Sequence, residues 1–199
     1  MRERGLTARR RKSYRTTKRF DERLVHAENL LARNFSPDRM NSVWATDIAY
    51  TATAEGWLCL AVVVDHFSRK MIGWTMSMSI STELVLEALR MDLVAWQAPR
   101  GLIVHSDRGE QYASRRYLRV LHARGLLQSM SRKGDCWDNA CVGSFFKTLK
   151  VEFVGSTTCR TRKETQTAIF EFIEVFCSRI RLHSTLASFT PEETEAHAG

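Results

Sequence analysis

Two aspartates lie where a protein chain can hold a charge rigidly, because each belongs to an apolar segment or directly follows one. Asp107 comes after the apolar residues 102–104 and lies in the polar segment 105–112. Asp47 lies inside a second largely apolar segment, 43–50. A carboxylate at the end of a buried strand is held at the edge of a sheet. The two segments therefore predict a pair of carboxylates fixed by a common sheet.

Paired carboxylates indicate a particular chemistry, because they repel each other unless a cation lies between them. Their hard oxygen ligands favour Mg²⁺ or Mn²⁺. Two such ions about 3.5–4 Å apart support phosphodiester displacement by stabilising the attacking and the leaving oxygen. Hydrolysis and DNA strand transfer use the same kind of site, with water or a 3′-hydroxyl as the nucleophile. The alternative is that Asp47 and Asp107 are ordinary solvated acids at strand ends.

A third ligand for such a site would be expected on a helix further along the chain. Segment 138–150 has helical spacing, with Phe145, Phe146 and Leu149 as its apolar side. It carries no acid on the turn that should face the two aspartates. The sequence therefore predicts two carboxylates and a gap in the third position.

The elements that must position these residues predict a mixed sheet. The first three expected strands form an antiparallel meander, and the second is nearly continuous in apolar residues, which is typical of a central strand covered on both faces. Two more strands alternate with helices further along. The five expected strands cover 43–52, 58–66, 71–79, 102–107 and 126–130.

Helices are expected between and after these strands. Ser81 or Thr82 should cap the first, Ser114 the second and Asp138 the third, and Gly125 should end the second. The four expected helices cover 82–96, 114–125, 138–153 and 163–179. Segment 21–32 could add a short helix, and residues 179–199 should form a polar tail.

A meander followed by α/β units predicts an α/β fold in which helices flank a mixed five-stranded sheet, the ribonuclease-H-like arrangement. Asp47 and Asp107 can meet in it if their strands are neighbours. We expect three regions: a basic N-terminal arm or linker (1–40), a catalytic core (41–160), and a C-terminal helix and tail packed on the core or extending it (161–199).

The net charge of +8 is concentrated in the first 20 residues, which hold nine Lys or Arg residues and one acid. The remainder is balanced. A basic arm on a neutral body suits a polyanion such as nucleic acid. Its densest part is Arg9, Arg10, Arg11 and Lys12. The alternative for this arm is a disordered, solubilising tail.

Composition argues against several other classes. The longest apolar run, 57–64, has eight residues, whereas roughly 20 are needed to span a bilayer. No secretory signal is evident. The five cysteines form no CxxC pair, so reduced thiols are favoured over a zinc site. We expect a cytoplasmic protein with no membrane partner.

Several short motifs, in order, resemble the integrase core of bacterial insertion-sequence transposases. The resemblance is to the large insertion-sequence family numbered three, a branch of the retroviral-integrase superfamily, and it covers about residues 25–195. The core motifs are 44–50, 65–69, 105–112, 129–134, 137–140 and 144–150. The C-terminal signature of the family is matched by Arg179, Arg181, His183, Ser184, Thr190 and Pro191.

The resemblance implies a DDE triad that binds two Mg²⁺ ions, with Asp47 and Asp107 as its first two acids. The family places a glutamate after 35 intervening residues, and this count leads to Gly143. The family pattern Asp-Asn-Ala, two variable residues, Glu-Ser-Phe-Phe corresponds to DNACVGSFF at 138–146. The third acid is therefore replaced by glycine, and metal binding should be weakened.

No neighbouring acid is expected to substitute. Glu152 lies nine residues after Gly143, which at about 100° per residue puts it on the opposite helix face. Asp138 is better placed to cap the helix, and Glu110 lies in a loop with no helix to position it. We therefore expect catalysis to be impaired by orders of magnitude.

The resemblance also implies binding to transposon-end and target DNA, a homo-oligomer on DNA, and a helix-turn-helix region from an upstream segment or partner. Near the site, Arg132, Lys133, Lys147 and Lys150 could hold DNA phosphates or form a plain solvated face. The tryptophans are interpreted as core and loop packing, with Trp137 as the best candidate for base stacking. His105 is interpreted as a positioning group rather than a metal ligand.

Three functions remain open. The first is a transposase integrase core for DNA cleavage and strand transfer, impaired at Gly143. The second is a non-catalytic remnant that binds DNA or a partner. The third is a nuclease of the same fold that acts on other nucleic acid, for which a preference for RNA–DNA hybrids would be diagnostic.

Overall fold

A computed structural model describes residues 26–95, 98–154 and 161–198. Its centre is a five-stranded sheet with the strand order β3-β2-β1-β4-β5. The strands are β1 (Val43–Thr53), β2 (Gly56–Asp65), β3 (Met71–Ser77), β4 (Ile103–Ser106) and β5 (Leu127–Met130). All five expected strands are present, and the longest pairing joins β1 and β2.

The pairing is mixed, as the sequence predicted. β1 and β2 are antiparallel over almost their whole length, and β2 pairs antiparallel with β3. β4 is parallel to both β1 and β5. β2 is buried from Leu58 to its end at Asp65, which confirms that this apolar strand is covered on both faces. The α/β, ribonuclease-H-like fold class is therefore confirmed.

Six α-helices lie in the described part of the chain. Three cover one side of the sheet, namely α1 (Thr82–Ala95), α2 (Glu110–Ala113) and α3 (Arg115–Arg124). The others are α4 (Ala140–Thr148), α5 (Arg162–Glu171) and α6 (Pro191–Ala198). Wider π-helical turns, η3 (Leu149–Val154) and η4 (Phe172–Ile180), continue α4 and α5, and the short 3-10 turns are η2 (Cys136–Asn139) and η5 (Ser184–Leu186).

Local sequence signals explain several helix ends. The Ser81 hydroxyl accepts a hydrogen bond from the Leu84 amide, and the Ser114 hydroxyl accepts one from the Tyr117 amide. Gly125 ends α3 in the left-handed conformation, with φ of 68°. These caps are the ones that the sequence predicted.

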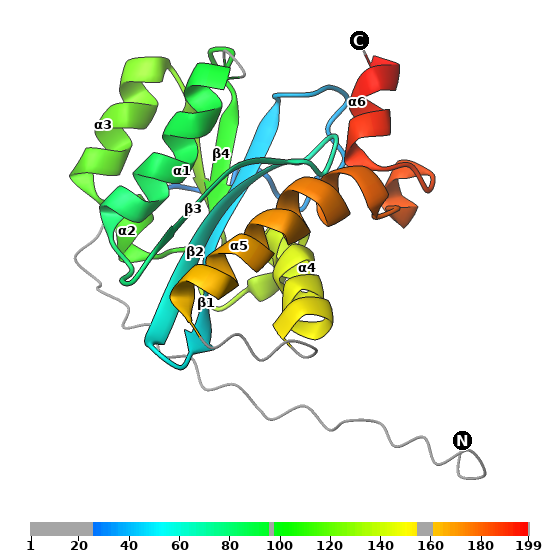
Figure 1. The fold of residues 1–199 in the computed structure, drawn as a ribbon. Helices are drawn as coiled ribbons and strands as arrows, with labels where there is room; N and C mark the ends of the chain where they lie inside the picture. Colours follow the sequence, from blue (N-terminus) through cyan, green and yellow to red (C-terminus); the bar gives the residue numbers. More distant parts are fainter. Residues whose placement is uncertain (1–25, 96–97, 155–160, 199) are drawn as a thin grey trace.

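The sheet separates two hydrophobic cores, and side chains of β1 alternate between them. Trp44 lies in the core under α1–α3, whereas Ala45 and Ala49 lie in the core under α4, α5 and η4. Figure 1 shows α1–α3 on one side of the sheet and α4 and α5 on the other. The second core places α4 against β1 and β2.

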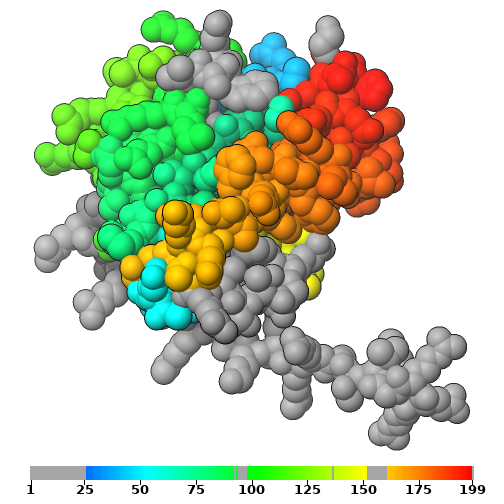
Figure 2. All heavy atoms as spheres, viewed as in Figure 1, coloured from blue at the N-terminus to red at the C-terminus, as the bar shows by residue number. Residues whose placement is uncertain are grey.

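The C-terminal region packs on this second core. Ile169, Ile173 and Cys177 are buried there beside residues of β2 and α4. Figure 2 shows the chain from α5 to α6, coloured gold to red, as one continuous band across the face drawn there. No helix in the described part of the chain is long and apolar enough to cross a membrane.

Three local expectations were wrong. Residues 26–32 form no helix, and Ala32 and Arg33 have positive φ. Residues 191–198, expected within a polar tail, form α6, because Thr190 and Glu193 exchange capping hydrogen bonds and Pro191 occupies the first helical position. Glu110, expected in a loop, begins the short helix α2.

The third expected helix also begins differently. Asp135, not Asp138, caps the 3-10 turn η2, because its side chain accepts a hydrogen bond from the Trp137 amide. Asp138 is instead buried and binds arginine side chains. A carboxylate can bind a helix N-terminus or an arginine pair, and here Arg33 comes from a distant part of the chain and Arg132 from the preceding loop.

Candidate functional site

Asp47 lies on β1, and Asp107 directly follows the neighbouring strand β4, which ends at Ser106. The parallel pairing of β1 and β4 runs from Val43↔Ile103 to Ala45↔His105. Each aspartate lies two residues beyond this last pair, so the same register places them opposite each other. Neighbouring strands are about 4.8 Å apart. We therefore expect the two carboxylates to lie near each other, and both residues are half-buried.

The alternation of side chains places both acids on the α4 side of the sheet. Asp47 lies between Ala45 and Ala49, which both belong to the core under α4. On β4, Val104 belongs to the opposite core, so His105 points to the α4 side, and Asp107 continues this alternation just beyond the strand. The two acids thus share one face.

Short local hydrogen bonds hold the two carboxylates. Asp47 Oδ1 accepts from the amide of Ile48 at 2.8 Å, and Asp107 Oδ1 accepts from the amide of Gly109 at 2.9 Å. Close to Asp47, the hydroxyls of Thr46 and Tyr112 lie 3.2 Å apart, and burial raises the pKa of Tyr112 well above its usual value. Local hydrogen bonds therefore restrain both carboxylates.

Gly143 lies on α4 one turn after the contact that ties this helix to β1. The Asn139 side-chain amide donates to the backbone carbonyl of Thr46 at 3.1 Å. Position 143 is four residues later and lies on the same side of the helix. Gly143 is exposed, and a Cβ built there would meet nothing within 4 Å. Position 143 thus has room for a side chain.

No third ligand replaces the missing acid in the part of the chain that the structure describes. Within those residues, no group of three or more His, Cys, Asp or Glu side chains is arranged to hold a metal ion. Asp138 is committed elsewhere, and the Glu152 side chain lies outside the described residues. The two aspartates are thus the carboxylates that the fold brings together here.

Asp138 organises the loop before α4. It receives hydrogen bonds from Arg132 Nε and Nη2 at 2.9 and 2.7 Å, from Arg33 Nε at 3.0 Å, and from the Asn29 side chain at 2.8 Å. The hydrogen bond from Arg132 is the main reason that the pKa of Asp138 lies well below its usual value. This cluster joins residues 29–33 to the loop between β5 and α4.

His105 supports the strand that carries Asp107. It is buried, and its Nδ1 and Nε2 atoms lie 2.9 Å from Ser129 Oγ and 3.2 Å from Ser131 Oγ. Burial lowers the pKa of His105 to about 4, so the ring is neutral at pH 7. Both nitrogens are engaged across the β4–β5 pair, which agrees with a positioning role.

The basic residues expected to contact DNA have different environments. Lys133, Lys147 and Lys150 are exposed, and Lys147 is four residues after Gly143 on the same helix. Arg132 is exposed too, but its guanidinium binds Asp138. The remaining predicted contacts, Arg9, Arg10, Arg11 and Lys12, lie outside the described residues. Phosphate binding by any of them stays a prediction.

The tryptophans do not all pack in the core. Trp44 is fully buried, whereas Trp57 is 54% exposed and packs edge-on against Tyr50, and Trp137, the expected exception, is 70% exposed. Trp137 lies on η2, directly before α4. Its backbone is fixed by the Asp135 cap, so the indole is presented on a rigid turn.

Sequence reasoning missed several contacts around the site. The motifs contained Tyr112 and Asn139, but the sequence did not show that both would contact Thr46. It also did not show that Arg69 would reach α4, where its Nη1 atom lies 2.9 Å from Cys141 Sγ. In each case, the available signal was membership of a motif, without any indication of the partner.

Comparisons with known proteins agree with this fold and with the motifs. Two family profiles described as integrase core domain match residues 37–136 and 143–197. Transposase InsF for insertion sequence IS3A from Escherichia coli (strain K12) is 42% identical over 195 residues, which cover 98% of this chain and 68% of the relative.

Solved structures extend the likeness to viral integrases. A chain of the simian T-cell lymphotropic virus intasome in complex with PP2A regulatory subunit B56 gamma matches with a TM-score of 0.64 at 15% identity, over 87% of this chain and 60% of that one. The HTLV-2 integrase catalytic core domain in complex with magnesium matches with a TM-score of 0.55 at 14% identity, over 78% of this chain and 96% of that one. At such low identity these matches concern the fold.

The strand order, the two packed cores and the structural matches define an integrase core of the ribonuclease-H-like class. The sequence comparisons narrow this class. The chain belongs to the integrase core domain family, in the branch of the transposases of IS3 insertion sequences. The family resemblance expected from the sequence is thereby confirmed.

Proposed function

We propose that this chain is the part of a transposase that acts on DNA by cleavage and strand transfer. The observation that carries the proposal is the parallel pairing of β1, which holds Asp47, with β4, which ends one residue before Asp107. Two rigidly placed carboxylates on one face of a sheet can hold a cation against a phosphodiester. The relatives named transposase make DNA the expected substrate.

Asp47 and Asp107 would hold the divalent ion, Mg²⁺ or Mn²⁺. Their carboxylates are hard oxygen donors of the kind these ions prefer, and both are half-buried on rigid elements. When bound, such ions supply Lewis-acid activation of the attacking and leaving oxygens. The chain itself orients the two carboxylates, through the β1–β4 pairing and through the bridge from His105 to β5.

Gly143 leaves this donor set incomplete. It occupies the position at which the family pattern has a glutamate, one turn after the Asn139 contact to β1, and glycine supplies no side-chain oxygen. With one carboxylate fewer, the site binds its metal more weakly and orients the reacting groups less well. We therefore propose that the activity of this chain is impaired.

The surface around the site suits nucleic acid. Lys147 and Lys150 extend from α4 and η3 beyond Gly143, and Lys133 and Trp137 lie on the loop that precedes α4. Lysines contact phosphates, and an exposed, rigid indole can stack on a base. The expected partners are transposon-end and target DNA, further copies of this chain on that DNA, and an upstream helix-turn-helix segment.

A second candidate is a transposase remnant that binds DNA or an intact partner without catalysis. The absence of a third metal-binding side chain within the described residues favours it. Both candidates predict DNA binding, but only the first predicts joining. Such a remnant could interfere with an intact transposase by forming mixed assemblies.

A strand-transfer assay on matched end DNA separates the two candidates. The chain and its Gly143→Glu variant are compared in Mg²⁺ and in Mn²⁺. Slow joining by the chain and fast joining by the variant would support an impaired transposase core. Tight DNA binding without joining by either protein would support the remnant. Preferred cleavage of an RNA–DNA hybrid would oppose both and favour a nuclease.

A further inference from the structure

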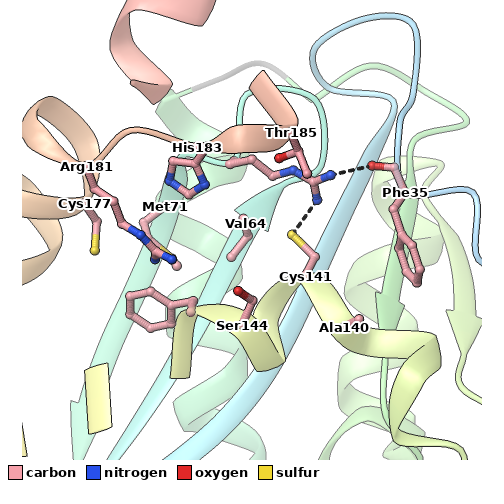
Figure 3. A pocket seen from close by; sticks show the side chains of 12 residues that line it. Phe35, Val64, Met71, Ala140, Cys141, Ser144, Cys177, Arg181, His183 and Thr185 are labelled. Atoms are coloured by element: carbon pink, nitrogen blue, oxygen red, sulfur yellow. Dashed lines mark hydrogen bonds between the residues drawn. The ribbon is translucent and has the colours of Figure 1, made fainter. Parts of the chain in front are cut away.

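A cavity of about 240 Å³ lies beside the start of α4. Its walls come from the start of α4, the β2–β3 connection, and the segment that follows η4 (Figure 3). None of the described residues that line it is acidic. Its polar lining consists of Arg69, Cys141, Ser144, Arg181, His183 and Thr185.

Arg69 places one positive charge in the wall of this cavity, and two contacts hold its guanidinium. Its Nη2 atom donates to the carbonyl of Phe35 at 2.8 Å, and its Nη1 atom contacts Cys141 Sγ at 2.9 Å. Neither of these two partners is a carboxylate, so neither neutralises the positive charge of the Arg69 guanidinium. Its buried Nε atom has no hydrogen-bond partner within the described chain.

Arg181 provides a second positive charge. It is half-buried, and its guanidinium makes no hydrogen bond or ion pair with any residue that the structure describes. Leaving a partly buried charge unpaired is unfavourable, so a structure that retains one is suited to an anion from outside. By contrast, Arg179, two residues earlier, binds Glu192 at 3.0 Å.

The pKa of His183 reflects the positive charge of the two arginines. His183 lines the cavity, and its pKa is lowered to about 4, first by burial and then by the charges of Arg181 and Arg69. The ring is therefore neutral at pH 7 and can donate a hydrogen bond. Figure 3 shows the Ser144 hydroxyl directed into the cavity, and Thr185 on its opposite wall.

We propose that this cavity binds a phosphate of the DNA backbone. Guanidinium groups bind phosphate oxygens in a bidentate manner, and neutral donors complete such sites. The cavity is smaller than pockets for drug-sized ligands, which suits a single phosphate group. The inference rests on the proposed function, which makes DNA the anion that reaches this surface.

Its place on α4 links the cavity to the metal site. Ser144 lines the cavity, and the preceding residue is Gly143. A strand anchored here would be held by the same helix that faces the two aspartates. The phosphate contact would then position the strand relative to the reacting phosphodiester, without taking part in the chemistry.

The test compares Arg181→Gln with Arg179→Gln, which removes the same charge from an ion pair outside the cavity. DNA affinity is measured by fluorescence anisotropy between about 50 and 200 mM salt, without divalent ions. Arg181→Gln should weaken binding about tenfold and reduce the slope of log K against log salt by about 0.9. Arg179→Gln should leave the slope near that of the unchanged chain.

A second measurement uses inorganic phosphate as the probe. At constant ionic strength, replacing chloride by phosphate should raise the Tm of the unchanged chain and of Arg179→Gln more than that of Arg181→Gln. Arg181→Lys should keep most of the salt slope but bind more weakly, because lysine cannot form the bidentate contact. Circular dichroism checks that each variant is folded.

Three other results would each overturn the inference, and each points to a different explanation. Equal salt slopes for the two glutamine variants would show that no DNA phosphate binds at Arg181, and DNA joining by Gly143→Glu would still stand. Phosphate stabilisation without DNA binding by any protein would remove both the DNA ligand and the proposed function. A change of oligomeric state in Arg181→Gln alone, seen by light scattering, would assign the cavity to contacts between copies of the chain.

Discussion

Replacing Gly143 by glutamate returns a carboxylate to the position at which the family pattern has its third acid. A Cβ at this position meets no heavy atom within 4 Å, so the first atom of the new side chain has no steric cost. Removing glycine from a helix interior should stabilise the fold by up to about 1 kcal/mol, and the new pair with Lys147 at i+4 should add about 0.3 kcal/mol. Repulsion from the two aspartates opposes these gains.

Without a divalent ion, these effects should nearly cancel, and the free energy of unfolding should change by about 1 kcal/mol or less. With Mg²⁺ the balance changes, because a third carboxylate strengthens metal binding to the folded state. An ion concentration of about 100 times Kd would stabilise the variant by about 2.7 kcal/mol. The variant should therefore show a Mg²⁺-dependent rise in Tm that exceeds that of the unchanged chain.

The joining rate should increase by about 100-fold or more, which corresponds to about 2.7 kcal/mol of the activation barrier. Single-turnover strand transfer on radiolabelled end DNA measures it. Gly143→Gln is the matched control, because glutamine has nearly the helix propensity of glutamate but no charge. Equal joining by the glutamine and glutamate variants, or by the unchanged chain and the glutamate variant, would refute the reasoning about position 143.

Three further changes test the surroundings of the site. In the glutamate variant, Asp47→Asn or Asp107→Asn should each abolish the Mg²⁺-dependent rise in Tm; a full response in either would remove that residue from the proposed metal site. Asp138→Asn should lower the free energy of unfolding by about 2 kcal/mol in urea titrations at pH 7, because two half-exposed arginines lose a buried carboxylate. The folded-state pKa of Asp138 lies below its usual 3.8, so this stabilisation is complete above about pH 4 and is lost as the pH falls further. At lower pH the free energies of unfolding of the variant and of the unchanged chain should therefore converge. Trp137→Ala should weaken binding to single-stranded DNA by about 1–3 kcal/mol, whereas Trp57→Ala, which removes another exposed tryptophan, should not; equal losses would argue against stacking at η2.

The sequence alone determined much of the fold, because the decisive patterns are local. Continuous apolar residues marked β2 as central, and serine and glycine marked the ends of α1 and α3. Hydrophobic periodicity and capping depend on residues a few positions apart, which a sequence displays directly. The capping signal of α6 at Thr190 and Glu193 was equally local, although it was overlooked.

The candidate site was predictable to the extent that motifs fix residue positions. The counting that leads to Gly143, and the placement of Asp47 and Asp107 on separate strands, needed only the order of residues. That β1 and β4 are neighbours and pair in parallel depended on contacts between segments some 60 residues apart.

Only the tertiary structure decided which polar side chains meet. Asp138 could have capped a helix, but Arg33 reaches it from 105 residues away. Arg69 lies beside Cys141, 72 residues later, and both share a cavity with Arg181. Such contacts form when α4 and the C-terminal segment pack on the same face of the sheet, and the side chains that meet there carry no mutual spacing in the sequence. The sequence therefore determined the carboxylates and the missing third acid, whereas folding determined the charged cavity beside them.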